Sequence, residues 1–304
     1  MLSSKGCDLT SASRGSIYDL GYQRYQGVRL GRRHAMWALY LHGLRGIFGI
    51  GRSTWAKITA FGILGIALIP AVVQLGVAAL SPEDVEVIAP EDYYQTIEPL
   101  LAIFCALVAP DLVGRDQRTQ TLSLYFSRAL RREDYAFARY GAFVTSILVL
   151  TVVPQMLMYV GNVAAATDVW GAVRDTWQDI PAILASAFLL SVLVAGIGVA
   201  VSSQTTRRSY ATVTIVAVFV LATGISTAIF ESAGPDDGRY ALLFSPFHVV
   251  RGMTLWVFGV SPVIHEEDQL YEAGFNGIVY AIDAVVVSLA CLALVVRRYR
   301  SVSA

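Results

Sequence analysis

The sequence predicts an all-α integral membrane protein with six transmembrane helices. The chain has 304 residues, of which 55% are hydrophobic and only 15% are charged, a composition that is unusual for a soluble domain of this length. Each of its long apolar runs approaches the roughly 20 residues that cross a bilayer core as a helix. In addition, 20 of the 23 lysines and arginines fall on one side of the map that these runs define. The six expected spans cover residues 57–80, 97–113, 141–163, 180–201, 211–230 and 277–296.

This charge asymmetry predicts the orientation of the chain. Basic residues near the ends of spans resist translocation, so we expect a multi-pass protein of the cell membrane with both termini in the cytoplasm. Only Arg174, Arg239 and Arg251 fall on the outer side. The outer loops are acidic, which is consistent with this orientation but adds no independent support, because acidic residues steer topology little.

The part of the chain before the first span divides into two segments. Residues 1–32 form a cytoplasmic N-terminal segment, and residues 33–56 are expected to form an interfacial amphipathic helix followed by a turn. Apolar residues recur there at three- and four-residue spacing, with arginines and histidines largely on the other side, a pattern that suits the membrane–water interface. A soluble helix packed on a partner is the alternative. The proposed membrane-facing residues are Trp37, Tyr40, Leu44 and Phe48. No apolar segment precedes this region, so we expect no cleavable signal peptide.

Two of the connecting segments are distinctive. Residues 114–140 join the second and third spans on the cytoplasmic side and are the most charged internal segment. Residues 231–276 form a long extracytoplasmic loop that contains a mostly apolar stretch interrupted by Pro246 and Arg251. We expect re-entrant or interfacial helices there, because irregular backbone at membrane depth must be covered by protein. A seventh span is the alternative.

Asp283 is an isolated carboxylate inside the sixth span. A carboxylate within a bilayer is costly and usually faces a cavity or a partner group. Two interpretations stay open at this point. Asp283 contacts a proton or a substrate at an intramembrane polar site, or it forms a hydrogen bond to another helix. Gln74, Gln155 and Asn162 are uncharged polar residues in other spans, and hydrogen bonds between helices are expected for them.

The sequence contains no recognisable catalytic, metal-binding or nucleotide-binding motif. The stretch from Gly46 to Ser53 approaches a phosphate-binding loop, but the required lysine is Arg52 and no strand precedes it. The acidic stretch 265–268 lacks the two-histidine spacing of a zinc site. None of the three cysteines falls in an outer loop, so no disulfide framework is expected. We therefore expect no enzyme activity, bound cofactor, metal or nucleic-acid partner for this chain.

The segment that follows the second span carries a resemblance to a known family. It contains the stretches DQRTQTL, from residue 116 to 122, and YFSRALRR, from residue 125 to 132. Together with the element YDLGYQRYQGVR at 18–29, the interfacial helix, the six spans and the long last outer loop, they resemble the permease subunits of type-2 ABC exporters (the ABC-2 transporter family), in particular actinobacterial ones. The chain departs from the family pattern at Gln120, where glycine is usual, at Ala129, where proline is usual, and at Ala138-Arg139, where Gly-Lys is usual.

The resemblance implies a transmembrane permease subunit of an ATP-driven exporter. Two copies, or one copy and a paralogue, would form the pathway, and two separate ABC ATPase subunits would bind ATP and Mg²⁺. Residues 114–140 would be the coupling segment that docks on the ATPase, and the interfacial helix would give a second contact. The residues expected to couple to the ATPase are Asp116, Arg118, Thr121, Leu122, Tyr125, Arg128 and Arg131.

The residues themselves also favour docking in this segment. The segment places four apolar residues within a charged surrounding, Leu122, Leu124, Tyr125 and Phe126, as do the anchors of many protein interfaces. The alternatives are a stand-alone secondary transporter or channel, and a membrane assembly factor. The nearly uncharged spans favour an amphipathic or lipid-like cargo over a small ion, but the sequence does not name a substrate.

Overall fold

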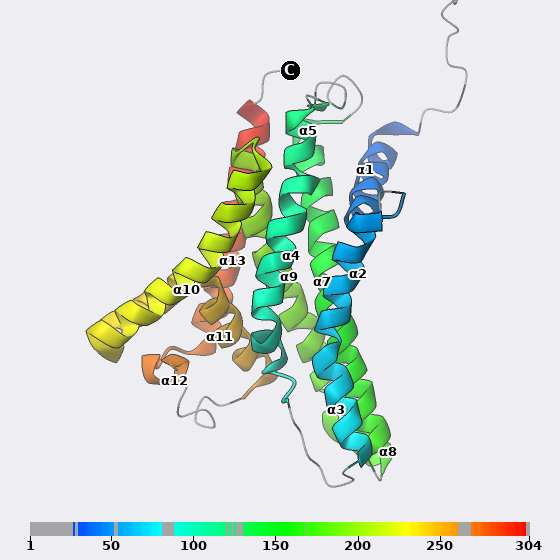
Figure 1. The fold of residues 1–304 in the computed structure, drawn as a ribbon. Coiled ribbons are helices and arrows are strands. Elements are labelled where there is room, and N and C mark those ends of the chain that lie inside the picture. Colours follow the sequence, from blue (N-terminus) through cyan, green and yellow to red (C-terminus); the bar gives the residue numbers. More distant parts are fainter. Residues whose placement is uncertain are drawn as a thin grey trace, which may run out of the picture. The chain divides into compact units, whose positions relative to one another are not determined.

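The fold is taken from a computed structural model, which describes residue 27 and residues 30–51, 54–80, 88–119, 121–122, 125, 130–166, 168–260 and 269–301. The chain divides into two units, 1–30 and 31–304, and every described helix belongs to the second. All regular secondary structure in the described part is helical (Figure 1). Six helical segments of the described part, one of them α2 and α3 together, are long and apolar enough to cross a membrane, which confirms the predicted helical fold with six candidate spans. The helices are α1 (Gly31–Ile47), α2 (Thr54–Ala67), α3 (Ile69–Leu80), α4 (Tyr93–Leu112), α5 (Gly114–Arg118), α7 (Arg132–Ala165), α8 (Val169–Thr176), α9 (Asp179–Gln204), α10 (Arg208–Gly238), the 3-10 helix η1 (Arg239–Phe244), α11 (Pro246–Phe258), α12 (Gln269–Ala273) and α13 (Gly277–Ser301).

Helices α4 and α9 form the centre of the bundle. Figure 1 shows them between α2, α3 and α7 on one side and α10, α11 and α13 on the other. Most side chains of α4 and α9 are buried, whereas fewer than a third of those of α10 and α13 are. Glycine lets the central helices approach closely: a Cβ added at Gly198 would lie 3.1 Å from Phe143 Cε1 and 3.2 Å from Ala109 Cβ. Small residues are common at such helix contacts in membranes.

The first span consists of two helices, α2 and α3, separated at Leu68. Pro70 lies two residues further on, and proline lacks the N–H that would continue the helical hydrogen bonds. The hydroxyl of Tyr93, which begins α4 and is fully buried, donates a hydrogen bond to the carbonyl oxygen of Ala67 at 3.1 Å. The break is thus held by a neighbouring span.

Helix α1 lies where a helix is predicted before the first span, and one of its faces is buried against the rest of the protein. It packs alongside the start of α7, where the hydroxyls of Tyr40 and Thr145 lie 2.9 Å apart. Its buried residues are Leu39, Gly43 and Ile47, next to the predicted face, because α7 covers that side. Trp37 is 57% exposed, and its ring stacks on that of Tyr40 with centroids 5.1 Å apart. Leu44 and Phe48 are half-buried. The position of α1 at a membrane surface stays a prediction.

The segment between the fifth and sixth spans contains a well-packed helix, α11. Helix α10 ends its regular course at Gly234, whose φ of 80° is readily adopted only by glycine, and η1 leads into α11. Ser245 caps α11 by accepting a hydrogen bond from the His248 N–H. Arg251, only 8% exposed, forms an ion pair with Asp92 at the start of α4. A helix is therefore present in this loop, while its re-entrant or interfacial placement in a membrane stays a prediction.

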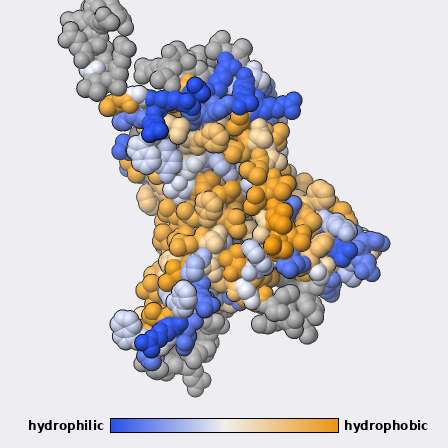
Figure 2. All heavy atoms as spheres, turned by 180° about the vertical axis from the view of Figure 1, so that it is seen from behind, coloured by the Kyte–Doolittle hydropathy of each residue, from blue (hydrophilic) through white to orange (hydrophobic). Residues whose placement is uncertain are grey.

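The surface of the second unit divides into three zones along the bundle. Figure 2 shows, on the face it presents, a hydrophobic band between two hydrophilic ends. We call one of these ends the basic end, which comprises α5, the starts of α1, α7 and α10, and the ends of α9 and α13. We call the opposite end the acidic end, which comprises α8, α12, the starts of α4, α9 and η1, and the end of α10. Most helices run a few residues beyond the predicted spans, since a helix can continue outside hydrocarbon; α7 begins at Arg132 and not at Gly141.

Candidate functional site

The basic end contains a network of buried polar side chains centred on α5, the short helix that begins the predicted coupling segment. Asp116 of α5 accepts a hydrogen bond of 2.7 Å from the hydroxyl of Tyr135. It also pairs with the guanidinium of Arg139, which is only 5% exposed. Both partners belong to α7. A buried ion pair with this geometry resists separation, because removing one partner leaves an uncompensated charge.

The next residue, Gln117, connects α5 to two further spans. Its side-chain amide donates to the backbone carbonyl of Ser203 at 3.2 Å and to the hydroxyl of Tyr299 at 3.3 Å. Ser203 lies at the end of α9 and Tyr299 at the end of α13. The ring of Tyr299 meets that of Tyr135 edge to face, with centroids 5.0 Å apart, a favourable aromatic geometry. Helix α5 is therefore attached to three long helices at once.

Partly exposed ion pairs surround this core. Arg300 Nε donates to Glu133 at 2.9 Å, and Arg32 donates two hydrogen bonds to Asp134 at 2.5 and 2.6 Å. The hydrogen bonds with Asp134 raise the pKa of the Arg32 guanidinium, which stays charged at any physiological pH. Exposed ion pairs of this kind contribute little to stability, because solvent screens them. They help to position α1 and α13 on α7, but the buried contacts of α5 contribute more to stability.

A polar cavity of about 690 Å³ opens beside α5. Side chains of α1, α4, α7 and α10 line it, including the charged residues Arg45, Asp111 and Arg208. Asp111 lies 3.4 Å from Arg208 Nε and 3.9 Å from a guanidinium nitrogen of Arg118. Because carboxylates and guanidinium groups both line this cavity, it suits water and further salt bridges better than one charged ligand.

The structure brings some of the predicted coupling residues together with Asp116 and leaves others apart. Thr121 donates its hydroxyl to the Asp116 carbonyl at 3.3 Å. Leu122 is 6% exposed and belongs to the chain's own core, and Tyr125 is half-buried with its ring 5.9 Å from that of Tyr135. Arg118 and Arg131 are exposed. Arg128, Leu124 and Phe126 lie outside the described residues. The docking role of the segment stays a prediction.

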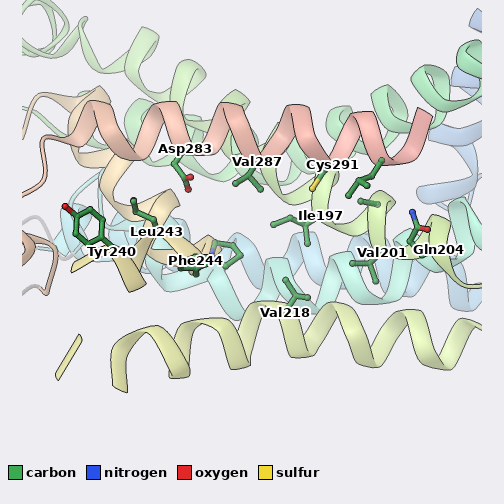
Figure 3. Close-up of a pocket in the computed structure, with 13 residues that line it drawn as sticks. Ile197, Val201, Gln204, Val218, Tyr240, Leu243, Phe244, Asp283, Val287 and Cys291 are labelled. Carbon is green, nitrogen blue, oxygen red and sulfur yellow. The ribbon is translucent and has the colours of Figure 1, made fainter. Parts of the chain in front are cut away.

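Asp283 lines a second cavity, of about 680 Å³ and nearly all apolar, between α9, α10, η1 and α13. Figure 3 shows its carboxylate pointing from α13 toward this space. Oxygen Oδ2 of Asp283 is buried and has no hydrogen-bond partner among the described residues. Of the two interpretations of Asp283, a side chain that faces a cavity agrees with this geometry, whereas the alternative hydrogen bond to another helix is absent from the described part of the chain.

Several contacts of the site have no clear signal in the sequence. Tyr135, Arg139 and Tyr299 each look like an ordinary residue at the end of a span, and their partners are distant in the chain. Arg251 stands out only as an interruption of an apolar stretch. Its one available signal is that it is among the three basic residues on the otherwise acidic side, where a carboxylate partner is expected.

No cluster of three or more metal-ligating side chains occurs among the residues that the structure describes. The chain matches no protein-family model, and no curated protein matches it. Its function must therefore be inferred from the geometry of the basic end and of the Asp283 cavity.

Proposed function

We propose that this chain is the membrane-spanning permease subunit of an ATP-driven ABC exporter. It works with a second copy or a paralogue, and with two separate ATPase subunits that bind ATP and Mg²⁺. The six apolar helices support a multi-pass membrane protein. The observation that carries the proposal is the attachment of α5 to α7, α9 and α13 through Asp116 and Gln117.

The attachment of α5 matters because it provides a mechanical connection. A force applied to α5 by a partner reaches three spans through side-chain contacts that are largely buried. The two states of a transporter must differ in contact free energy for such a force to shift their populations. If the Asp116–Arg139 ion pair or the Gln117 hydrogen bonds are lost or exchanged between the two states, the states differ in contact free energy.

The distribution of charge supports the proposed orientation. Arginines of α5, of the start of α10 and of the end of α13 gather at the basic end, while Asp92, Asp168 and Asp179 belong to the acidic end. Basic residues are retained on the cytoplasmic side of a membrane. We therefore propose that the basic end faces the cytoplasm, where ATPase subunits are found.

Co-purification with an ATPase tests the proposal. The chain is co-expressed with an ATPase encoded by a neighbouring reading frame and extracted in mild detergent. The variant Arg115→Glu/Arg118→Glu reverses two exposed charges on α5 and avoids Leu122, whose substitution would disturb the chain's own core. We expect it to lose the ATPase, whereas Arg174→Glu/Arg239→Glu at the acidic end retains it. All variants must elute like wild type in size-exclusion chromatography. If the wild-type chain recovers no ATPase, the proposal is wrong.

The Asp283 cavity favours a second candidate function, a stand-alone secondary transporter. Intramembrane carboxylates often mark ion or substrate pathways. Substrate counterflow in liposomes that contain only this chain distinguishes the two. Uptake that is driven by an ion gradient and lost in Asp283→Asn would support the secondary transporter, and strict dependence on an ATPase and ATP would support the exporter.

A further inference from the structure

The cavity beside Asp283 combines an apolar interior with a single charged side chain. Its walls include Ile197, Val201, Val218 and Val287, and the other polar groups that line it are those of Gln204, Tyr240 and Cys291. Its volume of about 680 Å³ falls within the range of roughly 300–1,000 Å³ that is typical of small-molecule sites. Most of the contact surface in this cavity therefore favours an apolar molecule.

Asp283 has no protein partner for its charge in the described part of the chain. Among those residues no lysine, arginine or histidine forms an ion pair with it, and Oδ2 is buried without a hydrogen bond. A carboxylate in an apolar surrounding is costly unless a cation or a hydrogen-bond donor compensates it. A ligand that carries a positive charge would supply this compensation.

Aromatic rings lie at the same end of the cavity as the carboxylate. Figure 3 shows Tyr240, Leu243 and Phe244 near Asp283, with Gln204 at the far end. Phe244 is 81% exposed and Tyr240 is 54% exposed. Aromatic faces attract cations, and quaternary ammonium groups are often recognised this way. Arg239 already lies over the Tyr240 ring and the Phe275 ring, with its guanidinium carbon 5.1 and 5.3 Å from their centroids. Phe244 is therefore the ring at this end that a ligand cation would contact.

The shape of the cavity suits an elongated or bulky apolar body. Its lining follows α13 from Asp283 to Leu294, which is about 16 Å at 1.5 Å per residue. Helix α10 forms the opposite wall and packs on α4 and α9, leaving the space between it and α13 open. A ligand can therefore place a charged group at Asp283 and its apolar part between α10 and α13.

We propose that this cavity binds a lipophilic monovalent cation, with Asp283 as its counter-ion. This inference gives the proposed exporter a class of ligand, and it therefore rests on the proposed function. Binding itself needs neither ATP nor an ATPase subunit. The cavity can therefore be tested in the isolated chain, and the result is independent of the co-purification experiment.

The experiment measures binding of tetraphenylphosphonium to the full chain in phosphatidylcholine nanodiscs, after subtraction of binding to empty nanodiscs. Tetraphenylborate has the same shape and the opposite charge, so it separates charge recognition from simple partition. We expect saturable binding of the cation and no saturable binding of the anion. Asp283→Asn should raise the Kd of the cation by about tenfold or more. Asp179→Asn removes a carboxylate from the start of α9, outside the cavity lining, and should leave the Kd unchanged.

A cavity-filling variant keeps the test decisive if Asp283→Asn does not fold. Val287→Trp occupies the space one turn from Asp283 and keeps the carboxylate. It should abolish saturable binding while the protein elutes like wild type. Equal binding of the cation and the anion, an unchanged Kd in folded Asp283→Asn, or an unchanged Kd in Val287→Trp would each overturn the proposal.

Discussion

Tyr135 of α7 donates its hydroxyl to Asp116 of α5 across 2.7 Å. This bond joins the helix that begins the predicted coupling segment to the longest helix of the described bundle. Tyr135 is fully buried, and the same ring packs against Tyr299 of α13. One side chain therefore holds α5, α7 and α13 together, which makes it a direct probe of the proposed mechanical connection.

Replacing Tyr135 with phenylalanine removes the hydrogen bond and keeps the ring contacts. We expect Tyr135→Phe to lower the free energy of unfolding by about 1 kcal/mol, the usual net value of one hydrogen bond. The measurement is unfolding of the purified protein by titration with SDS. Tyr210→Phe, at an exposed tyrosine on α10, should change the free energy by much less. An equal effect of the two substitutions would show that the Asp116 bond contributes nothing specific.

The Asp116–Arg139 pair predicts non-additive effects. Asp116→Asn leaves a buried guanidinium without its carboxylate, so we expect a loss of about 3 kcal/mol. Arg139→Met should cost a similar amount. The double variant removes both charges and should lose less than the sum of the two single variants. A double-mutant cycle from SDS unfolding gives the coupling energy, and simple additivity would argue against a functional pair at this position.

A second charged contact fixes the acidic end. Asp92→Asn should destabilise the protein by about 3 kcal/mol, because Arg251 is buried in α11 and this carboxylate is its ion-pair partner. Asp175→Asn, at an exposed position of α8, serves as the control and should have little effect. Retained stability in Asp92→Asn would mean that α11 is held on α4 without this pair. The readout is the midpoint temperature at which the folded peak is lost in size-exclusion chromatography.

The close contact of α9 with α4 and α7 predicts an intolerance for larger residues. Gly198→Val places methyl groups against Cys105, Phe143 and Ala109, and overpacking of this kind usually costs about 1–3 kcal/mol. Gly224→Val in α10 adds its side chain where no atom lies within 4 Å, so it should be tolerated. Comparing the yield and thermal stability of the two variants tests whether the central helices are tightly packed.

The orientation can be tested with single cysteines. In a background with Cys7→Ser, Cys105→Ala and Cys291→Ala, we introduce Thr119→Cys at the basic end or Asp175→Cys at the acidic end; both positions are exposed. A membrane-impermeant maleimide added to intact cells should label position 175 and leave position 119 unlabelled until the cells are lysed. Labelling of position 119 in intact cells would reverse the proposed topology.

The number of spans could be predicted because it depends on local composition. Apolar runs such as 180–201 need no partner to be recognised, and α9 covers this run nearly to the residue. Helix α7 begins at Arg132, before the predicted start of the third span at Gly141, and the polar residues Tyr135 and Arg139 interrupt the apolar pattern in this first part of the helix. These residues are helical because they pack against α5 and α13, and such long-range contacts leave no local signal.

The candidate site was only partly predictable for the same reason. The sequence alone singles out Asp116, which lies in the segment that carries the family resemblance, and Asp283, which is a carboxylate inside an apolar span. Gln117 connects α5 to Ser203 and Tyr299, 86 and 182 residues further along the chain, and no spacing rule relates these positions. In contrast, the predicted hydrogen bonding of polar residues between spans is confirmed for Gln74 and Asn162, at 3.3 Å, because such residues within apolar runs have few other partners.

The first span bends at Leu68, between α2 and α3, and α4 contacts the span beside this bend. Tyr93, at the start of α4, donates its hydroxyl to the carbonyl of Ala67. Pro70 removes one helical hydrogen-bond donor, while helical bonds still run from Leu68 to Leu64 and from Val72 to Leu68. Any change in the bend between α2 and α3 must therefore either carry α4 along or break this bond. The outer half of the span, α3, packs on α7, where Gln74 donates to Asn162 at 3.3 Å, so the two sides of the bend are held by different helices and a change in the bend would shift α4 relative to α7.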